Sequence, residues 1–191
     1  MNETNILRAK NLATEAHAGQ FRKNSGIPYI THPERVANKV REWATINYWW
    51  DGQKCDHEKL VKAAWTHDVL EDCPQISKEQ FIHVTDQATY DLVLELTNPS
   101  KGSNAPRAVR KQMDRDHLKV VCFEAKIIKL IDRIENLKDT LDEMNESNFK
   151  FAQLYASESR LLLDCIKDAD EGLANELLSL IEKIENAKIR S

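Results

Sequence analysis

Turn-forming residues are scarce in this chain of 191 residues, which has only five glycines and five prolines. Strand-rich domains usually need more of these residues at their turns, so the composition favours helices joined by short loops. Hydrophobic residues make up 41% of the chain and charged residues 30%, which is ordinary for a globular domain. We therefore expect a single all-α domain, residues 1–191, with one core.

Other features that the sequence lacks limit the cellular compartments and the binding partners that we expect for the protein. No apolar run approaches the roughly 20 residues that span a bilayer, and the N-terminus MNETNILRAKNLA lacks the apolar centre of a signal peptide. The four cysteines form no CxxC pair, which argues against a cysteine zinc site and fits reduced thiols. The net charge of −4 gives no overall positive field for nucleic acid. We interpret the chain as cytoplasmic, without nucleic acid or membrane as a partner; a homo-oligomer stays open.

Apolar residues recur at helical spacing along most of the chain, and no repeat or linker marks a domain boundary. The segment 19–33 contains two glycines and two prolines and is typical of an ordered loop. A capping box of Ser77 and Gln80 starts a short helix through Phe81. Helices are expected at residues 4–18, from about 33, 57–70, from 77, 86–96, 106–121, 123–141, 148–168 and 171–189.

The strongest chemical signal is the pair His67-Asp68, followed by Glu71 and Asp72. If the helix continues that far, residues four apart lie on one face, so one turn presents an imidazole and three carboxylates together. Like charges at that density are unfavourable unless a cation neutralises them. Imidazole and carboxylate ligands suit a first-row divalent ion such as Mn²⁺ or Fe²⁺.

Two further residues could complete a coordination shell. His32 lies at the predicted junction of loop and helix, and Asp132 interrupts the apolar stretch IIKLIDRI, where an unpaired carboxylate is unfavourable. Asn136 lies one turn further on the same face as Asp132. The residues alone leave simpler alternatives open, because His32 could cap a helix and Asp132 could pair with Lys129 or Arg133 on the surface.

Three segments together carry a specific family resemblance. Residues 16–37 (AHAGQFRKNSGIPYITHPERVA), 65–73 (WTHDVLEDC) and 124–139 (EAKIIKLIDRIENLKD) resemble the hydrolase domain of the RelA/SpoT family. The chain is most similar to the free-standing small alarmone hydrolases of that family, which include metazoan SpoT homologues. The resemblance covers most of residues 1–165, in order and at similar spacing.

The resemblance implies an HD-domain helical bundle with a buried site for one divalent metal ion, Mn²⁺. Members of the family remove pyrophosphate from the 3′ position of the stringent-response alarmones ppGpp and pppGpp, leaving GDP or GTP. The substrate is thus a small-molecule nucleotide, and we expect a hydrolase alone, without a synthetase domain. The positions that match the family's metal ligands are His32, His67, Asp68 and Asp132.

The resemblance also assigns roles around the metal. An acidic pair is associated with activating or positioning the attacking water, a basic pair lies near the nucleotide, and one amide lies at the pocket. The residue that stacks on the base is left open between two aromatics. The matching residues are Glu71 and Asp72 (acidic pair), Arg22 and Lys23 (basic pair), Asn136 (pocket), and Phe151 or Tyr155 (base).

The sequence departs from the family pattern at some positions, so two other hypotheses about the function stay open. Cys73 stands where threonine is common, and residues 43–57 are longer and more aromatic than expected. The first alternative is an HD phosphatase acting on NADPH or another nucleotide phosphate. The metal ligands cannot distinguish the two substrates, because they act on the attacking water and not on the nucleotide base. The second is a catalytically silent nucleotide-binding or scaffold protein, which the intact ligand set argues against.

Overall fold

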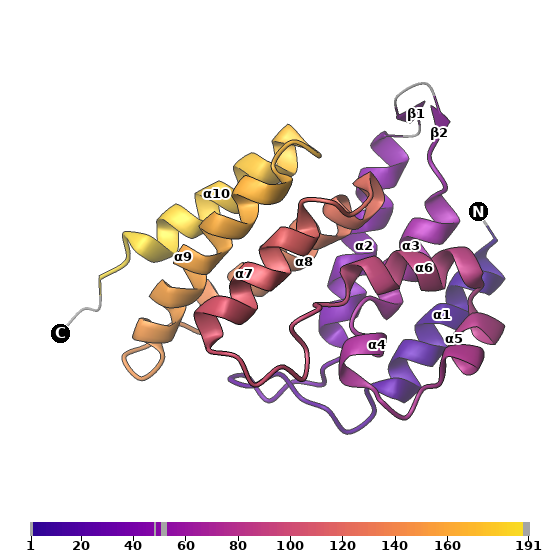
Figure 1. Cartoon of the computed structure of the whole chain (residues 1–191), viewed down its shortest axis with the longest axis horizontal. Helices are drawn as coiled ribbons and strands as arrows, with labels where there is room; N and C mark the ends of the chain where they lie inside the picture. The colour runs from indigo at the N-terminus through magenta and orange to yellow at the C-terminus, as the bar shows by residue number, and fades with distance from the viewer. Residues whose placement is uncertain (1, 48, 51–52, 189–191) are drawn as a thin grey trace. The chain divides into compact units, whose positions relative to one another are not determined.

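The structure is a computed structural model that describes residues 2–47, 49–50 and 53–188. Within those residues it contains ten helices, α1 to α10, and one two-stranded antiparallel sheet (Figure 1). The all-α prediction is confirmed. By contacts between its residues the chain divides into two compact units, Met1–Asn98 and Pro99–Ser191, each described by itself below. The single domain predicted for residues 1–191 stays a prediction.

The first unit is built around α3, which packs against α1, α2 and α6. The apolar face of α3 is fully buried, with Leu60, Val61 and Ala64 at 0% exposure, so this helix supplies the unit's central layer. The bounds of the elements are α1 Glu3–Ala16, α2 Thr31–Ile46, β1 Trp49–Trp50, β2 Gln53–Lys54, α3 His57–Thr66, α4 Val69–Asp72, α5 Lys78–Val84 and α6 Gln87–Leu96.

Side chains at the starts of several helices accept hydrogen bonds from main-chain N–H groups that have no partner within the helix. Asp56 caps α3 through the N–H of Lys59 at 3.0 Å. The predicted capping box of Ser77 and Gln80 is present at the start of α5. Asp86 caps α6 through the N–H of Thr89 at 2.7 Å. These caps fix where each helix begins around the buried α3.

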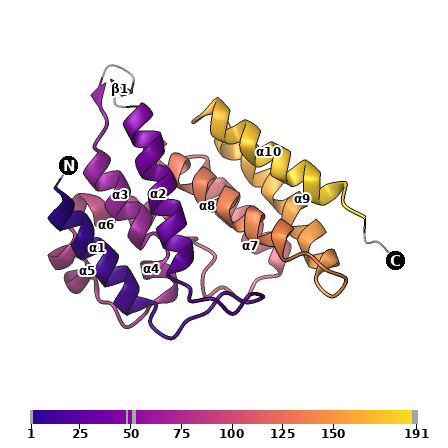
Figure 2. The same ribbon diagram turned by 180° about the vertical axis from the view of Figure 1, so that it is seen from behind.

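The second unit consists of α7 Arg107–Leu118, α8 Phe123–Asp142, α9 Phe149–Ile166 and α10 Glu171–Glu185. Helices α8 and α9 both pack on α10, and α9 and α10 lie side by side in opposite views (Figures 1 and 2). Helix α8 has the most buried residues of the four, and Ile127, Ile131 and Ile134 on it are fully buried. Helical periodicity predicted all four of these elements.

One prediction about the helices that carry His32 and His67 is confirmed and one is corrected. The helix expected from about residue 33 begins at Thr31, so His32 and Pro33 lie in its first turn, directly after the loop. The helix expected over residues 57–70 ends at Thr66, and α4 begins only at Val69. The imidazole of His67 donates a hydrogen bond to the carbonyl oxygen of Ala64. In a continuous helix this oxygen would accept from the main-chain N–H of Asp68.

The aromatic segment 43–57 contains the end of α2 and the short β1–β2 hairpin, and its residues 48, 51 and 52 lie outside the described part of the chain. The sequence predicts partly buried aromatic side chains at residues 48–50, and the side chains of these residues lie outside the described part of the chain. None of the helices in the described residues is both long and apolar enough to cross a bilayer.

Candidate active site

Three side chains of the first unit converge on one point. His32 comes from the first turn of α2, and His67 and Asp68 come from the break between α3 and α4. Oδ2 of Asp68 lies 3.1 Å from Nε2 of His67 and 3.9 Å from Nε2 of His32. The potential ligand atoms of all three residues lie within 4.8 Å of one another, and both imidazoles are buried. The packing of α2 on α3 brings His32 to the other two residues.

The neighbours of this cluster orient its ligand atoms. Nδ1 of His67 lies 2.8 Å from the carbonyl oxygen of Ala64, to which it donates, so Nε2 keeps its lone pair on the side of Asp68. The hydroxyl of Tyr29 donates to Oδ2 of Asp68 at 2.6 Å. Two imidazole nitrogens and a carboxylate oxygen at this spacing could hold a divalent metal ion.

The predicted acidic pair follows directly in α4. Both oxygens of Glu71 lie 3.1 Å from Nδ2 of Asn98, and Oε2 also accepts from the main-chain N–H of Asn98 at 3.2 Å. Asp72 is half-buried, and its main-chain carbonyl lies 3.4 Å from Nε2 of Gln20. The structure thus supplies a partner for Glu71 that lies 27 residues away in the sequence and that no motif indicated.

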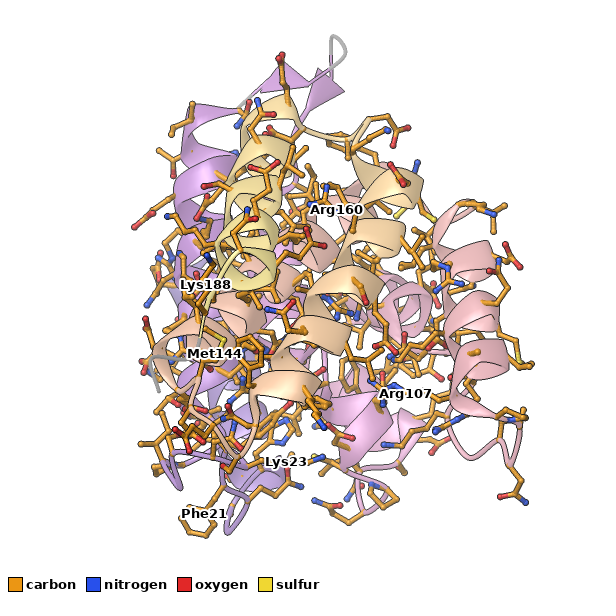
Figure 3. The ribbon with its side chains drawn as sticks, turned by 90° about the vertical axis from the view of Figure 1, so that its left-hand side faces the viewer. Phe21, Lys23, Arg107, Met144, Arg160 and Lys188 are labelled. Carbon is orange, nitrogen blue, oxygen red and sulfur yellow. The ribbon has the colours of Figure 1, made fainter. Side chains whose placement is uncertain are left out.

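The predicted basic pair lies on the loop between α1 and α2. The main chain of Arg22 bonds to Ile27 at 2.9 Å and to Gly26 at 3.0 Å, and Gly26 adopts a φ of 68° that suits glycine. The guanidinium of Arg22 lies 5.5 Å from the ring centre of Tyr29, whose hydroxyl contacts Asp68. Lys23 is exposed, and Figure 3 shows it on this loop with the ring of Phe21 pointing outward. The two cations therefore have different surroundings.

The remaining predicted site residues lie on α8 in the second unit. Asp132 is 5% exposed, accepts from Nδ2 of Asn136 at 2.6 Å and lies 3.3 Å from Nζ of Lys129. The simpler alternative was that Asp132 pairs with Lys129 on the surface. The pair with Lys129 is present, but it is buried rather than on the surface. The assignment of Asp132 as a metal ligand and of Asn136 as a pocket residue stays a prediction.

The two aromatic candidates for stacking on a base form a pair in the second unit. The rings of Phe151 and Tyr155 are stacked, with centroids 5.9 Å apart and planes at 9°. The guanidinium of Arg107, labelled in Figure 3, lies 5.9 Å from the centre of Phe151, and that of Arg133 lies 4.7 Å from the centre of Tyr155. The structure does not choose between the two rings.

A site of two histidines and an aspartate at a break between helices defines a class of protein, the HD-domain hydrolases. The chain belongs to this family: the model described as HD domain matches residues 9–157. Within the family it belongs with the small SpoT-like hydrolases, so the resemblance predicted from three motifs is confirmed by the relatives described next.

The curated relatives share one activity in their names, the hydrolysis of guanosine 3′-pyrophosphates. The chain is 31% identical over 135 residues to the guanosine-3′,5′-bis(diphosphate) 3′-pyrophosphohydrolase MESH1 of Xenopus tropicalis, covering 70% of this chain and 68% of that protein. The human protein of the same name is 30% identical over 135 residues, with the same shares covered. The bifunctional (p)ppGpp synthase/hydrolase SpoT of Escherichia coli is 46% identical over 63 residues, which cover 33% of this chain and 7% of that protein.

A solved structure shares the fold. It is described as a metazoan ortholog of SpoT that hydrolyses ppGpp and plays a role in starvation responses. The TM-score is 0.76, the sequence identity is 22%, and the match covers 94% of each chain. This likeness confirms the predicted HD-type helical fold.

Proposed function

We propose that this protein hydrolyses the 3′-pyrophosphate of ppGpp and pppGpp, releasing pyrophosphate and leaving GDP or GTP. The observation that carries the proposal is the convergence of His32, His67 and Asp68 in a chain whose curated relatives are named for this reaction. The four scattered thiols are typical of a reducing compartment, and we place the reaction in the cytoplasm.

The proposed metal is Mn²⁺, held by His32, His67 and Asp68, with Asp132 as the predicted fourth ligand. When bound, such an ion polarises a phosphoryl oxygen and lowers the pKa of a coordinated water. The two imidazoles would hold the ion through Nε2, the nitrogen of each ring that faces Asp68. Asp68 is held by Tyr29, so its carboxylate presents a fixed oxygen between the two rings.

The two acidic residues of α4, Glu71 and Asp72, act on the attacking water. Glu71 accepts that proton while the water oxygen forms its bond to the phosphorus attached to the ribose 3′-oxygen. The bond from phosphorus to the 3′-oxygen breaks, and the 3′-oxygen takes up a proton from solvent to become the ribose hydroxyl as pyrophosphate leaves. Asp72, on the same short helix, positions the water.

The basic residues hold the phosphates of the substrate. Arg22 offers a planar fork of N–H donors to phosphate oxygens, and Lys23 offers a point charge. A polyanion must approach a protein of net charge −4, so such local cations have to supply the attraction. Asn136 is assigned to the pocket, and the base stacks on Phe151 or Tyr155.

Product analysis after incubation with ppGpp and Mn²⁺ tests the proposal. We expect GDP and pyrophosphate to appear, a chelator to abolish both, and the variant His67→Ala to lose bound metal and turnover together. If ppGpp stays intact and NADPH releases inorganic phosphate under the same conditions, the alarmone is not the substrate and the alternative, NADPH or another nucleotide phosphate, is favoured.

A further inference from the structure

The carboxylate of Glu71 is held by one residue that lies outside every motif recognised in the sequence. Nδ2 of Asn98 lies 3.1 Å from each oxygen of Glu71, and the main-chain N–H of Asn98 donates to Oε2 at 3.2 Å. Both residues are half-buried. Only the amide nitrogen of Asn98 can face a carboxylate favourably, because its carbonyl oxygen would be an acceptor against an acceptor.

Asn98 is itself fixed by the end of α6. The main-chain N–H of Thr97 bonds to the carbonyls of Val93 at 3.1 Å and Leu94 at 3.3 Å, and the hydroxyl of Thr97 donates to Val93 at 3.0 Å. Helix α6 packs on α3, the helix that leads directly into the break carrying His67 and Asp68. The turn that carries His67 and Asp68 and the partner of Glu71 therefore follow two helices that pack on each other.

Glu71 has little support from its own helix. Helix α4 has four residues, Val69–Asp72, so it makes only about one turn and restrains the glutamate side chain weakly. A carboxylate offers about four lone-pair sites, and the N–H groups of Asn98 make two contacts to Oε2 and one to Oε1. Oε1 therefore keeps a lone pair that Asn98 does not engage and that stays available to accept a proton.

We propose that Asn98 is a positioning residue that orients Glu71 for the attack of water. The inference rests on the role given to Glu71 under the proposed function. Asn98 does not touch the substrate; it acts by keeping the proton-accepting lone pairs of Glu71 in one direction. Its loss should slow turnover without weakening the binding of metal or nucleotide.

The variant Asn98→Leu tests this, because leucine has a similar size and no donor. We expect kcat to fall about 10- to 100-fold, the range for losing a partner that orients a site residue. KM and Mn²⁺ affinity should stay within about twofold, since the metal ligands keep their partners. Asn98→Ala provides the same deletion should leucine disturb the fold, and circular dichroism checks both variants.

A double-mutant cycle separates positioning from a general structural role. In the background of Glu71→Ala, which is expected to retain metal and lose about 10²- to 10⁴-fold in rate, Asn98→Leu should have no further effect. A merely structural role would lower the rate in both backgrounds. Additive losses, or an Asn98→Leu enzyme with wild-type kcat, would overturn the proposal.

Asn5→Leu is the matched control. Nδ2 of Asn5 donates to Oε1 of Glu58 at 2.7 Å, which is the same amide–carboxylate pairing between α1 and α3. We expect this variant to keep wild-type kcat. Wild-type turnover in Glu71→Ala would refute the role of Glu71 and the positioning role with it, whereas intact ppGpp with the wild-type protein would refute the proposed function itself.

Discussion

Tyr29 illustrates how one hydroxyl group can determine a metal site. It donates at 2.6 Å to Oδ2 of Asp68, the oxygen nearest to both imidazoles. Replacing Tyr29 with Phe removes only that hydroxyl, and we expect Mn²⁺ affinity to fall about 10- to 100-fold, as for other partners of metal ligands. Isothermal titration calorimetry of the metal-free protein with Mn²⁺ measures the change.

Tyr90→Phe is the control for this prediction, because Tyr90 lies on α6 and its ring contacts Phe81, with centroids 5.7 Å apart. Equal Mn²⁺ affinity in Tyr29→Phe and wild type would contradict an orienting role for the hydroxyl.

At the residue scale, the sequence singled out three side chains that the structure brings together. His32, His67 and Asp68 were predicted as ligands, and their potential ligand atoms lie within 4.8 Å of one another; their role as ligands stays a prediction. Tyr29 and Asn98 were not assigned their contacts, because each bonds to a residue 39 or 27 positions away. Such pairs arise only from tertiary packing, and a single sequence carries no period or spacing that marks them.

At the scale of the element, Asp86 joins the start of α6 to α3. Its Oδ1 accepts from the N–H of Thr89 at 2.7 Å, and its Oδ2 forms a short ion pair with Nζ of Lys62, which is 4% exposed. Asp86→Ala removes the cap and leaves the buried ammonium with Glu58 at 3.5 Å. We expect the free energy of unfolding to fall by roughly 2–4 kcal/mol, measured by urea denaturation.

The pH dependence of this loss follows from the pKa of Asp86. Burial acts to raise the pKa of Asp86, but the hydrogen bonds from Lys62 and Thr89 outweigh it and the net pKa is lowered. A lowered folded pKa contributes stability that is complete above the unfolded value of about 3.9 and is lost as the pH falls through the folded pKa. The difference between wild type and Asp86→Ala should therefore shrink below about pH 4. A pH-independent difference would assign the effect to packing.

Helical periodicity predicted the elements well, and it failed where a side chain competes with the main chain. The apolar spacing of residues 57–70 is helical throughout, yet the helix ends at Thr66. His67 takes the carbonyl of Ala64, and this choice cannot be derived from hydrophobic spacing. The break matters for function, since it places His67 and Asp68 on a turn rather than on a helix face.

At the scale of the whole molecule, the thiols report on folding. None of the four cysteines, which all lie in the described part of the chain, forms a disulfide, and Cys73 is 1% exposed. Burial raises the pKa of Cys73 to about 11. Because only the thiolate is reactive, we expect Cys73 to resist iodoacetamide at pH 8 in the folded protein and to react only on unfolding.

Pulsed alkylation with mass spectrometry across a urea series measures this protection, with Cys55, Cys122 and Cys165 as half-buried comparisons. The midpoint for Cys73 should coincide with that of circular dichroism. Modification of Cys73 before the helices unfold would show that the first unit opens locally.

The division of the chain into two compact units was not apparent from the sequence. The segment TNPSKGSNAP, residues 97–106, follows the helix expected at 86–96, and the boundary between Asn98 and Pro99 falls inside it. A loop of this composition is the same whether it joins two helices of one core or two separately packed groups. Only the contacts of the flanking helices distinguish these cases, and those contacts depend on the whole fold.

The contact between Asn98 and Glu71 has a consequence for protein engineering. Polar loops at the edge of a packed unit are the usual places to insert a tag, a reporter domain or new chain termini. Here the first residues of such a loop bind an acid of the proposed active site, so the two sides of Asn98 are not equivalent. A fusion joined after Ser103 leaves the contact intact, whereas one joined between Thr97 and Asn98 separates a side chain of the active site from the residue that holds it.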